Sequence, residues 1–398
     1  MPQGAVNWSV RQAVRAIKAM EHQGFEWSQD YRAAGREALQ KVLEGRMARC
    51  VEGYLERLAA RDGSEPDRRN GHYVRHLLTE LGDIELSVPR TRRYSAMEVV
   101  RAYARRTAHV DRVILACFVL GLSTRKVGKA LVPILGESVS PTTVSRVAQT
   151  LDAAVSAFHR RRLKDAYRAL LFDGVVLARR TGAGAVRRPV LVAMGIRPDG
   201  KKEIIDYRLS ASESEAEWEA FLSDLYGRGL EGKGVALIGV DGGKGLLAAL
   251  STVVPGIPVQ RCWAHKARNV LDKVRKADHE AARRDLAAIR EAQDVRAARS
   301  AARRFADRWE PVYPKAVACL RQDLDDLLTF FLFQDPVWRK AVRTTNAIER
   351  KFVEVRRRTR PMGVFSDRTS MDRILFAVFT YENSKEGIYT PFLLTQNS

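Results

Sequence analysis

The sequence predicts an α/β fold, in which a sheet-containing domain carries an all-α insertion and follows a mainly helical region. Three observations indicate this architecture. Apolar runs of strand length lie at residues 170–177, 190–196 and 204–209. Residues 266–336 show helical patterns rich in Ala and Arg, without a strand pattern. Before residue 160, apolar residues recur mainly at helical spacing.

The order of the elements after residue 170 reduces the number of α/β folds that fit the sequence. Residues 198–200 (Pro-Asp-Gly) predict a hairpin turn, and Ser212 with Glu215 predicts the capped start of a helix. A strand at 235–240, a helix from Lys244 and a strand near 258–261 follow. Three strands, a helix, a strand, a helix and a strand is the element order of a ribonuclease-H-like fold. We expect its last helices to resume after the insertion.

The N-terminal part is predicted to combine a long helix with a short strand. Apolar residues at 39–58 recur every three or four positions, which predicts one face of a helix. Residues 61–71 contain Gly, Pro and Asn and predict a linker or loop. Residues 83–88 alternate between apolar and polar types and predict a strand.

Residues 123–151 predict a helix, a turn and a second helix, with Ser140 as N-cap and Pro141 as the first helical residue. A helix-turn-helix places its second helix in the major groove of DNA. Plain packing of two helices gives the same pattern, so both interpretations stay open. The candidate DNA-contacting residues of this segment are Arg125, Lys126, Thr142, Thr143, Ser145 and Arg146.

The charge of the chain favours a polyanionic partner. Its 398 residues include 68 Lys and Arg against 47 Asp and Glu, a formal net charge of +21 and an isoelectric point near 10.1. Nucleic acid and an anionic membrane would both attract such a chain. No apolar run approaches the roughly 20 residues of a membrane span, and four scattered cysteines predict no disulfide framework. We therefore expect a cytoplasmic protein.

Two aspartates are candidates for chemistry because of where they lie. Asp173 interrupts an apolar strand, where an unpaired carboxylate costs several kcal/mol or shifts its pKa. Asp241 ends another strand and is followed by Gly242 and Gly243. Each alone could be an ordinary strand-end residue. Two carboxylates in one place repel unless a cation lies between them, which suits Mg²⁺ and phosphodiester chemistry.

A third acid is expected at Glu349, in the first turn of a helix for which Asn346 is the predicted N-cap. Between residues 338 and 368, ten Lys or Arg stand against three Asp or Glu. These cations form either a solvated face or a cradle for phosphates. The candidate DNA-contacting residues near this acid are Arg350, Arg356, Arg357, Arg358 and Arg360, with Arg268 on the preceding insertion.

Cys262 and His265 form a single Cys-x-x-His pair. This pair is half of a zinc site, and no second pair stands at a suitable spacing. Buried packing of the cysteine is the alternative interpretation.

These motifs together resemble the bacterial branch of the Mutator-type superfamily of DDE transposases. The resemblance extends over nearly the whole chain and includes GDIELSVPR at 82–90, GLSTR at 121–125, VSPTTVSR at 139–146 and Arg268-Asn269. The Gly242-Gly243 pair departs from the pattern, because relatives often carry a polar residue or His there.

The resemblance implies a ribonuclease-H-like catalytic domain that holds two Mg²⁺ ions, or Mn²⁺ in their place, on Asp173, Asp241 and Glu349. It implies that Cys262, His265 and Asn346 support the site without binding the metals. It also implies double-stranded DNA as partner, in the form of terminal inverted repeats and target DNA, a homodimer, and strand transfer through a circular intermediate. A DNA-binding protein that has lost catalysis and a nuclease that cuts without joining are the alternatives.

The predicted organisation has six parts. They are a helical DNA-binding or dimerisation region (1–62), a small strand-containing region (63–112), the helix-turn-helix (113–160), the first part of the catalytic domain (161–265), the helical insertion (266–337) and the last part of the catalytic domain (338–398).

Overall fold

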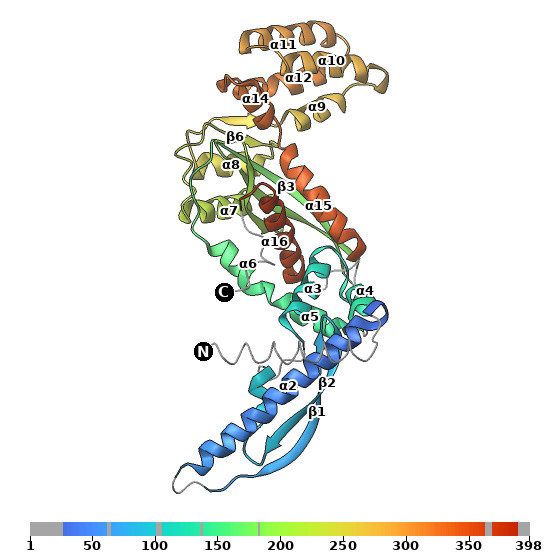
Figure 1. Cartoon of the computed structure of the whole chain (residues 1–398). Helices are drawn as coiled ribbons and strands as arrows, with labels where there is room; N and C mark the ends of the chain where they lie inside the picture. The colour runs from blue at the N-terminus through green and yellow to red at the C-terminus, as the bar shows by residue number, and fades with distance from the viewer. Residues whose placement is uncertain are drawn as a thin grey trace. The chain divides into compact units, whose positions relative to one another are not determined.

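The computed structural model shows a chain that divides into two compact units, Met1–Gln149 and Thr150–Ser398 (Figure 1). The structure describes residues 27–61, 65–100, 106–135, 138–181, 184–362 and 368–388. The six-part organisation expected from the sequence remains a prediction.

The first unit begins with a long helix packed on a β-hairpin. Helix α2 (Trp27–Ala59) contains the predicted helix 39–58, and strand β2 (Gly82–Thr91) contains the predicted strand 83–88, so both predictions are confirmed. The helix buries Met47 and Val51 against Leu86 and Val88 of β2. The prediction of a loop over 61–71 is wrong at its end, because the partner strand β1 (Arg69–Thr79) already starts there.

The early start of β1 has a local cause. Asn70 and Gly71 are turn-forming residues, and the register between β1 and β2 is irregular between Arg69 and His72. Gly71 has a φ of 69°, which an L side chain rarely adopts. Asn70 and Gly71 therefore form a bulge within the strand, although their residue types favour a turn.

A short 3₁₀ turn, η1 (Ala96–Val100), and three helices complete the first unit: α3 (Ala108–Val119), α4 (Thr124–Leu135) and α5 (Pro141–Gln149). The predicted cap of α5 is confirmed, since Oγ of Ser140 accepts a hydrogen bond from the Thr143 amide at 3.1 Å. Gly128 allows α4 to approach the segment before α5, because a Cβ there would lie 2.1 Å from the carbonyl oxygen of Val139. Residues 136–137 of the predicted turn lie outside the described residues.

The second unit is built on a five-stranded sheet with the strand order β5-β4-β3-β6-β7. Strands β3 (Ala169–Thr181), β4 (Gly184–Ile196) and β5 (Lys202–Leu209) are antiparallel neighbours, whereas β6 (Leu237–Val240) and β7 (Val259–Arg261) run parallel to β3. All five predicted strands are present, and the α/β class is confirmed.

Helices α7 (Glu215–Gly227) and α8 (Lys244–Val253) pack on one face of this sheet, where Phe172 contacts Trp218 edge-to-face. The predicted N-cap Ser212 is wrong by two residues, because Oγ of Ser214 accepts the hydrogen bond from the Glu217 amide. The serine-x-x-glutamate spacing occurs more than once here, and sequence alone does not select among the candidates.

Between β7 and α15 (Asn346–Met362) lies a segment of helices only, all of it within the described residues, which confirms the predicted strand-free character of 266–336. It contains α9 (Trp263–Leu271), η2 (Lys276–Asp278), α10 (His279–Arg290), α11 (Val295–Trp309), α12 (Pro314–Gln322), α13 (Leu324–Leu328), η3 (Thr329–Leu332) and α14 (Pro336–Val342).

Helices α15, α16 (Arg368–Lys385) and α6 (Leu151–Arg160) complete the second unit (Figure 1). Helix α16 packs on β5 and on α6, and α15 packs on β3 and α16. The predicted helix 371–383 is therefore confirmed. Among the described residues, no helix is both long enough and apolar enough to cross a bilayer.

Candidate active site

The two candidate aspartates occupy corresponding positions on neighbouring parallel strands. Phe172 of β3 pairs with Val240 of β6, so Asp173, inside β3, is the next residue on its strand and Asp241 directly follows the end of β6. The carboxyl end of a parallel strand, here that of β6, is where sites form in α/β sheets. Since Phe172 faces α7 and α8, the alternation along β3 turns Asp173 to the face on which α15 packs.

Asp173 is buried and incompletely satisfied. Its side chain is 3% exposed, and its Oδ2 atom has no hydrogen-bond partner among the residues that the structure describes. Burial and the nearby carboxylate of Asp241 together raise the pKa of Asp173 to about 7, against the opposing effects of Thr345 and His265. A carboxylate in this state lacks a positive charge that would compensate its burial.

Asp241 is held by the turn that follows β6. Its Oδ1 atom accepts a hydrogen bond from the Gly243 amide at 3.0 Å. Gly242 has a φ of 103°, and a Cβ at this position would lie 2.1 Å from the Nη2 atom of Arg261. The guanidinium of Arg261 therefore occupies the space of a side chain at 242, which explains why this chain carries glycine there.

Glu349 reaches the site because the start of α15 is tied to the start of α9. The Trp263 amide donates to the Arg343 carbonyl at 3.0 Å, and the Thr345 amide donates to Sγ of Cys262 at 3.3 Å. Glu349 lies in the first turn of α15, as predicted, and its Oε1 atom is 4.0 Å from Nε2 of His265. Asn346 is exposed and is the first helical residue rather than the predicted cap.

Cys262 and His265 both lie at the start of α9, on one side of this junction. Burial alone would raise the pKa of Cys262, but contacts with His265 and Thr345 lower it overall. Contact with Cys262, together with the carboxylates of Asp173 and Asp241, raises the pKa of His265 to about 9, although burial opposes the shift. The imidazole therefore supplies positive charge beside the acids. The cysteine is 1% exposed and anchors the backbone of Thr345.

The described residues contain no group of three or more His, Cys, Asp or Glu side chains that could hold a metal ion in their present positions. Asp173, Asp241 and Glu349 nevertheless act on one another electrostatically, since both other acids raise the pKa of Asp173. The structure thus brings the three predicted acids to one place without closing them into a ligand cage.

Sequence reasoning missed a fourth carboxylate near these acids. Glu213 precedes α7, and a Cβ on Gly174 would lie 2.8 Å from either carboxylate oxygen of Glu213. Burial and the charge of Asp241 raise the pKa of Glu213. The one signal in the sequence was Gly174 itself, because glycine inside an apolar strand often marks a close approach by another group.

The predicted basic residues near Glu349 differ in accessibility. Arg350 is exposed and Arg356 is half-buried, while Arg357 is exposed and pairs with Glu354 at 2.8 Å. Arg358 is only 8% exposed, and its Nη1 atom donates to Oε2 of Glu354 at 2.7 Å. Its guanidinium is therefore engaged inside the unit. The side chain of Arg360 lies outside the described residues.

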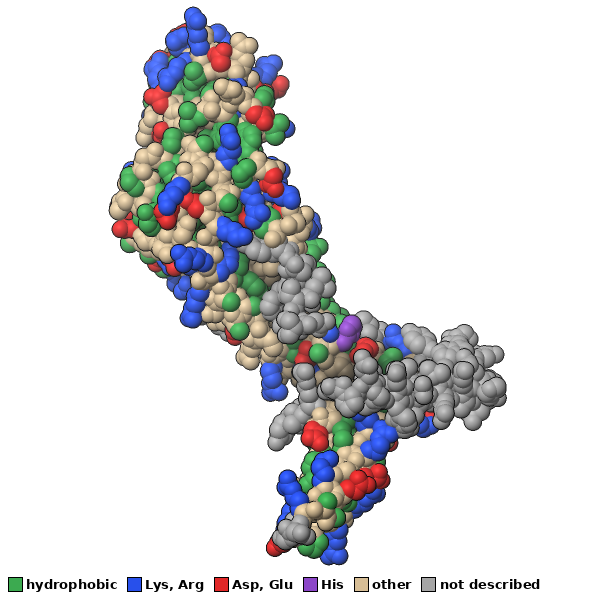
Figure 2. Space-filling model, turned by 60° about the vertical axis from the view of Figure 1, so that its left-hand side comes forward, with side chains coloured by type: hydrophobic (Ala, Val, Ile, Leu, Met, Phe, Trp, Pro, Cys, Tyr) green, Lys and Arg blue, Asp and Glu red, His purple; other side chains and the backbone are tan. Residues whose placement is uncertain are grey.

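The remaining predicted DNA contacts lie elsewhere. Arg268 is exposed on α9, and the first unit carries exposed Arg125 and Lys126 on α4. Helix α5 exposes Thr142, Ser145 and Arg146, while Oγ1 of Thr143 accepts a hydrogen bond from Ser140 at 3.0 Å. On the face drawn in Figure 2, Lys and Arg side chains recur over the described surface with Asp and Glu among them.

The family match and the similar sequences of this chain all carry the description of a transposase. Residues 10–387 match the family described as "Transposase, Mutator family". The transposase for insertion sequence element IS905 of Lactococcus lactis is 31% identical over 80% of this chain and 81% of its own length. The transposase for element ISRM5 of Rhizobium meliloti is 31% identical over 88% of both chains. That for IS1081 of Mycobacterium tuberculosis is 33% identical over 85% of this chain and 80% of its own.

Proposed function

Because the chain belongs to the Mutator family of transposases, we propose that it cuts and joins DNA with Asp173, Asp241 and Glu349 as a metal-binding triad. One observation carries this assignment. The Oδ2 atom of Asp173 is buried without a partner among the described residues and lies near a second carboxylate, which a protein tolerates where a cation binds.

The chemistry of the donor set fits Mg²⁺, or Mn²⁺ in its place. The three acids offer carboxylate oxygens, which are the ligands that hard divalent cations prefer. Two ions bound here would activate the attacking water or 3′-hydroxyl and stabilise the leaving oxygen of the phosphodiester. Asp173 and Asp241 would hold the ions from the sheet edge, and Glu349 would contribute from α15.

Other side chains of the site would hold this arrangement in place. The positive charge of His265 offsets part of the repulsion among the acids. Cys262 fixes the backbone just before α15 through the Thr345 amide, and Arg261 packs against the turn that orients Asp241. Each of these contacts limits how far a carboxylate can move when DNA enters the site.

The topology supports a ribonuclease-H-like catalytic domain. Three antiparallel strands are followed by two that run parallel to the first, in the order β5-β4-β3-β6-β7, with helices between them. The helical segment lies between β7 and α15, so it separates the second Asp of the triad from the Glu in sequence.

We also propose that helices α4 and α5 form a helix-turn-helix that binds the terminal inverted repeats of an insertion sequence. The capped start of α5 and its exposed Thr142, Ser145 and Arg146 support this assignment. Arg268, Arg350 and Arg356 would contact phosphates nearer the acids. Action as a homodimer and a circular intermediate complete the proposal.

A strand-joining assay tests the proposal. The full chain is incubated with Mg²⁺ and duplexes made from the two DNA sequences that flank its gene. We expect cleaved and joined products from the wild type, and no products from Asp173→Asn, because the loss of one ligand charge weakens ion binding at the reacting phosphate. Asp199→Asn makes the same change at the exposed β4–β5 turn and should react as the wild type does.

Each other outcome assigns a different function. Cleavage without joined products would indicate a nuclease, and binding without any reaction would indicate a DNA-binding protein that has lost catalysis. A joined product in which the two element ends abut would support the circular intermediate. If Asp173→Asn also abolished DNA binding, Asp173 would be a structural residue and the assigned triad would be wrong.

A further inference from the structure

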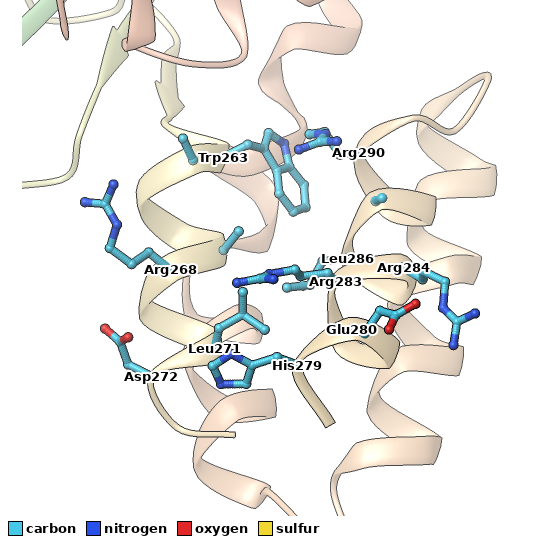
Figure 3. Close-up of a pocket in the computed structure, with 13 residues that line it drawn as sticks. Trp263, Arg268, Leu271, Asp272, His279, Glu280, Arg283, Arg284, Leu286 and Arg290 are labelled. Carbon is cyan, nitrogen blue, oxygen red and sulfur yellow. The ribbon is translucent and has the colours of Figure 1, made fainter. Parts of the chain in front are cut away.

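A cavity between helices α9 and α10 lies outside the proposed triad (Figure 3). Its volume is ≈ 610 Å³, and its lining includes four arginines, Arg268, Arg283, Arg284 and Arg290, against two acids, Asp272 and Glu280. Leu271 and Leu286 form part of its floor. The lining is therefore a set of cations on an apolar base, which suits an anionic ligand.

Three of the four arginines are available to such a ligand. Arg268, Arg283 and Arg284 are exposed, and their side chains form no hydrogen bond or ion pair with any residue that the structure describes. Arg290 is half-buried and donates from Nη2 to Glu291 at 2.7 Å, while its Nε atom is buried without a partner in the described part of the chain. A ligand with an acceptor atom near the buried Nε of Arg290 would remove the free-energy cost of this unpaired donor.

Positive charge is also crowded at the end of the cavity where Arg290 lies. The Nη1 atom of Arg343 donates to the Arg290 carbonyl at 3.4 Å, so two arginines share this place with one exposed acid, Glu291. Burial and the charge of Arg290 lower the pKa of Arg343. Like charges held this close are stabilised by an external anion.

Helix α9 connects the cavity to the candidate active site, because residues of this helix contribute to both. This helix begins directly after Cys262, carries His265 in its first turn and exposes Arg268 about one turn later, which is roughly 5 Å further along its axis. Arg283 points from α10 toward α9 in Figure 3, whereas Arg268 and Arg284 point outward on opposite sides. The cations are thus spread across both helices and do not converge on one point, and this spread fits an extended polyanion better than a single small anion.

We propose that the α9–α10 cavity binds successive phosphates of the DNA strand that leaves the active site. The inference rests on the proposed transposase function and extends it, because it assigns a DNA-binding role to the helical insertion. The ligand is the sugar-phosphate backbone, so the contact would be independent of base sequence.

The dependence of DNA affinity on salt tests this proposal. Binding of the full chain to a fluorescein-labelled duplex of mixed sequence, about three helical turns long, is measured without divalent ions at several KCl concentrations. The slope of log K against log [KCl] is negative, and the removal of one phosphate contact makes it shallower by about 0.9. We expect Arg268→Ala/Arg283→Ala to make this slope shallower by roughly 2 and to weaken DNA binding on the order of tenfold.

Two controls make the result specific. Arg296→Ala/Arg303→Ala removes the same charge from exposed positions of α11 outside the cavity, and the slope should stay at its wild-type value. Arg268→Lys/Arg283→Lys keeps the charge and should keep most of the slope. Thermal unfolding of all variants checks that the substitutions at these exposed positions leave the fold intact.

Equal slopes for the cavity variant, the α11 variant and the wild type would overturn the proposal. Competition by millimolar inorganic phosphate that requires Arg283, with an unchanged DNA slope, would also overturn it and indicate a small-anion site. The strand-joining assay is independent of this measurement. If the cavity variant shows the expected slope change but the wild type joins no DNA, the proposed function would be contradicted and the binding site would still stand.

Discussion

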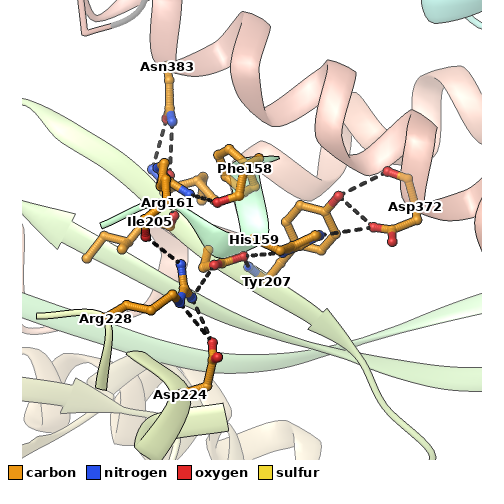
Figure 4. Close-up of polar contacts among 11 residues, drawn as sticks. Phe158, His159, Arg161, Ile205, Tyr207, Asp224, Arg228, Asp372 and Asn383 are labelled. Carbon is orange, nitrogen blue, oxygen red and sulfur yellow. Dashed lines mark hydrogen bonds and ion pairs between the residues drawn. The ribbon is translucent and has the colours of Figure 1, made fainter. Parts of the chain in front are cut away.

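Two aspartates of the second unit are almost equally buried on the same sheet but differ in how their charge is met. Asp206 of β5 is 1% exposed and Asp173 of β3 is 3% exposed. Asp206 accepts hydrogen bonds from Nη2 of Arg228 at 2.5 Å and from its neighbouring Tyr207 amide at 2.7 Å, and His159 lies 2.7 Å from its Oδ1 (Figure 4). Asp173 leaves Oδ2 without a partner among the described residues.

The difference is the one expected between a structural charge at Asp206 and the metal-binding charge proposed at Asp173. The protein compensates Asp206 with a network that extends through His159 and Tyr207 to Asp372 on α16. It compensates Asp173 only in part and places Asp241 near it. A buried carboxylate costs free energy unless it is paired. Burial of a carboxylate alone therefore does not point to a cation site, whereas a buried carboxylate oxygen without a partner supports the site proposed at Asp173.

Replacement of each aspartate by asparagine should have opposite consequences for stability. Asp206→Asn removes the counter-charge of Arg228 and His159, and we expect it to lower the free energy of unfolding by about 3–5 kcal/mol. Asp173→Asn removes an uncompensated charge and should leave stability unchanged or raise it by about 1 kcal/mol. Urea unfolding without divalent ions measures both.

A matched substitution separates charge from packing in this test. Asp152→Asn removes the partner of Arg373 on a half-exposed carboxylate and should cost less than Asp206→Asn, about 1–2 kcal/mol, because water screens part of the pair. If Asp173→Asn destabilised the protein as strongly as Asp206→Asn, the distinction between the two aspartates would be wrong.

The pH dependence of stability should sharpen the same comparison through His159. Burial would lower the pKa of this histidine, but hydrogen bonds with Asp206 and Asp372 raise it to about 9, above the ordinary value of 6.5. A raised pKa means that the folded state holds the proton more tightly. Its stabilisation, of roughly 3 kcal/mol, is then fully present below pH 6.5 and is lost as the pH rises through about 9.

The measurement is the free energy of unfolding between about pH 6 and 10, an interval that spans both pKa values of the histidine, for the wild type and His159→Gln. The wild type should lose stability over this interval relative to the variant, which cannot gain the charge. At the alkaline end, where His159 is neutral, the unfolding free energies of the two proteins should differ only by a constant that reflects the change in packing. Parallel curves across the whole interval would show that His159 is not charged in the folded state at neutral pH.

The sequence could predict the strands, the helical segment and the three acids, because each left a local signal. Asp173 was visible as a charge inside an apolar run and Asp241 as an acid before two glycines. The start of strand β1 at Arg69 was missed because the next residues, Asn70 and Gly71, are turn formers held in a bulge. Local preference was overridden there by pairing with β2.

The rest of the site could not be predicted, because it depends on contacts between distant segments. Asp206 also lies in a strand with several apolar residues, and nothing in the sequence shows that His159 and Arg228 compensate it. Glu213 approaches Gly174 only after α7 packs on the sheet. The sequence can thus indicate where a buried carboxylate lies, but only the fold shows whether a donor or an opposite charge pairs with it.

The smallest expected effect concerns the link that holds Glu349 near the uncompensated aspartate. Cys262→Ala leaves the buried Thr345 amide without its acceptor, Sγ of Cys262 at 3.3 Å, and we expect a decrease of about 1–2 kcal/mol in unfolding free energy. Cys262→Ser keeps an acceptor and should be less destabilising. Strand joining should fall more in the Ala than in the Ser variant, since α15 carries Glu349. An equal decrease of joining in both variants would mean that the thiol itself takes part in the site, and that the tether to Thr345 is secondary.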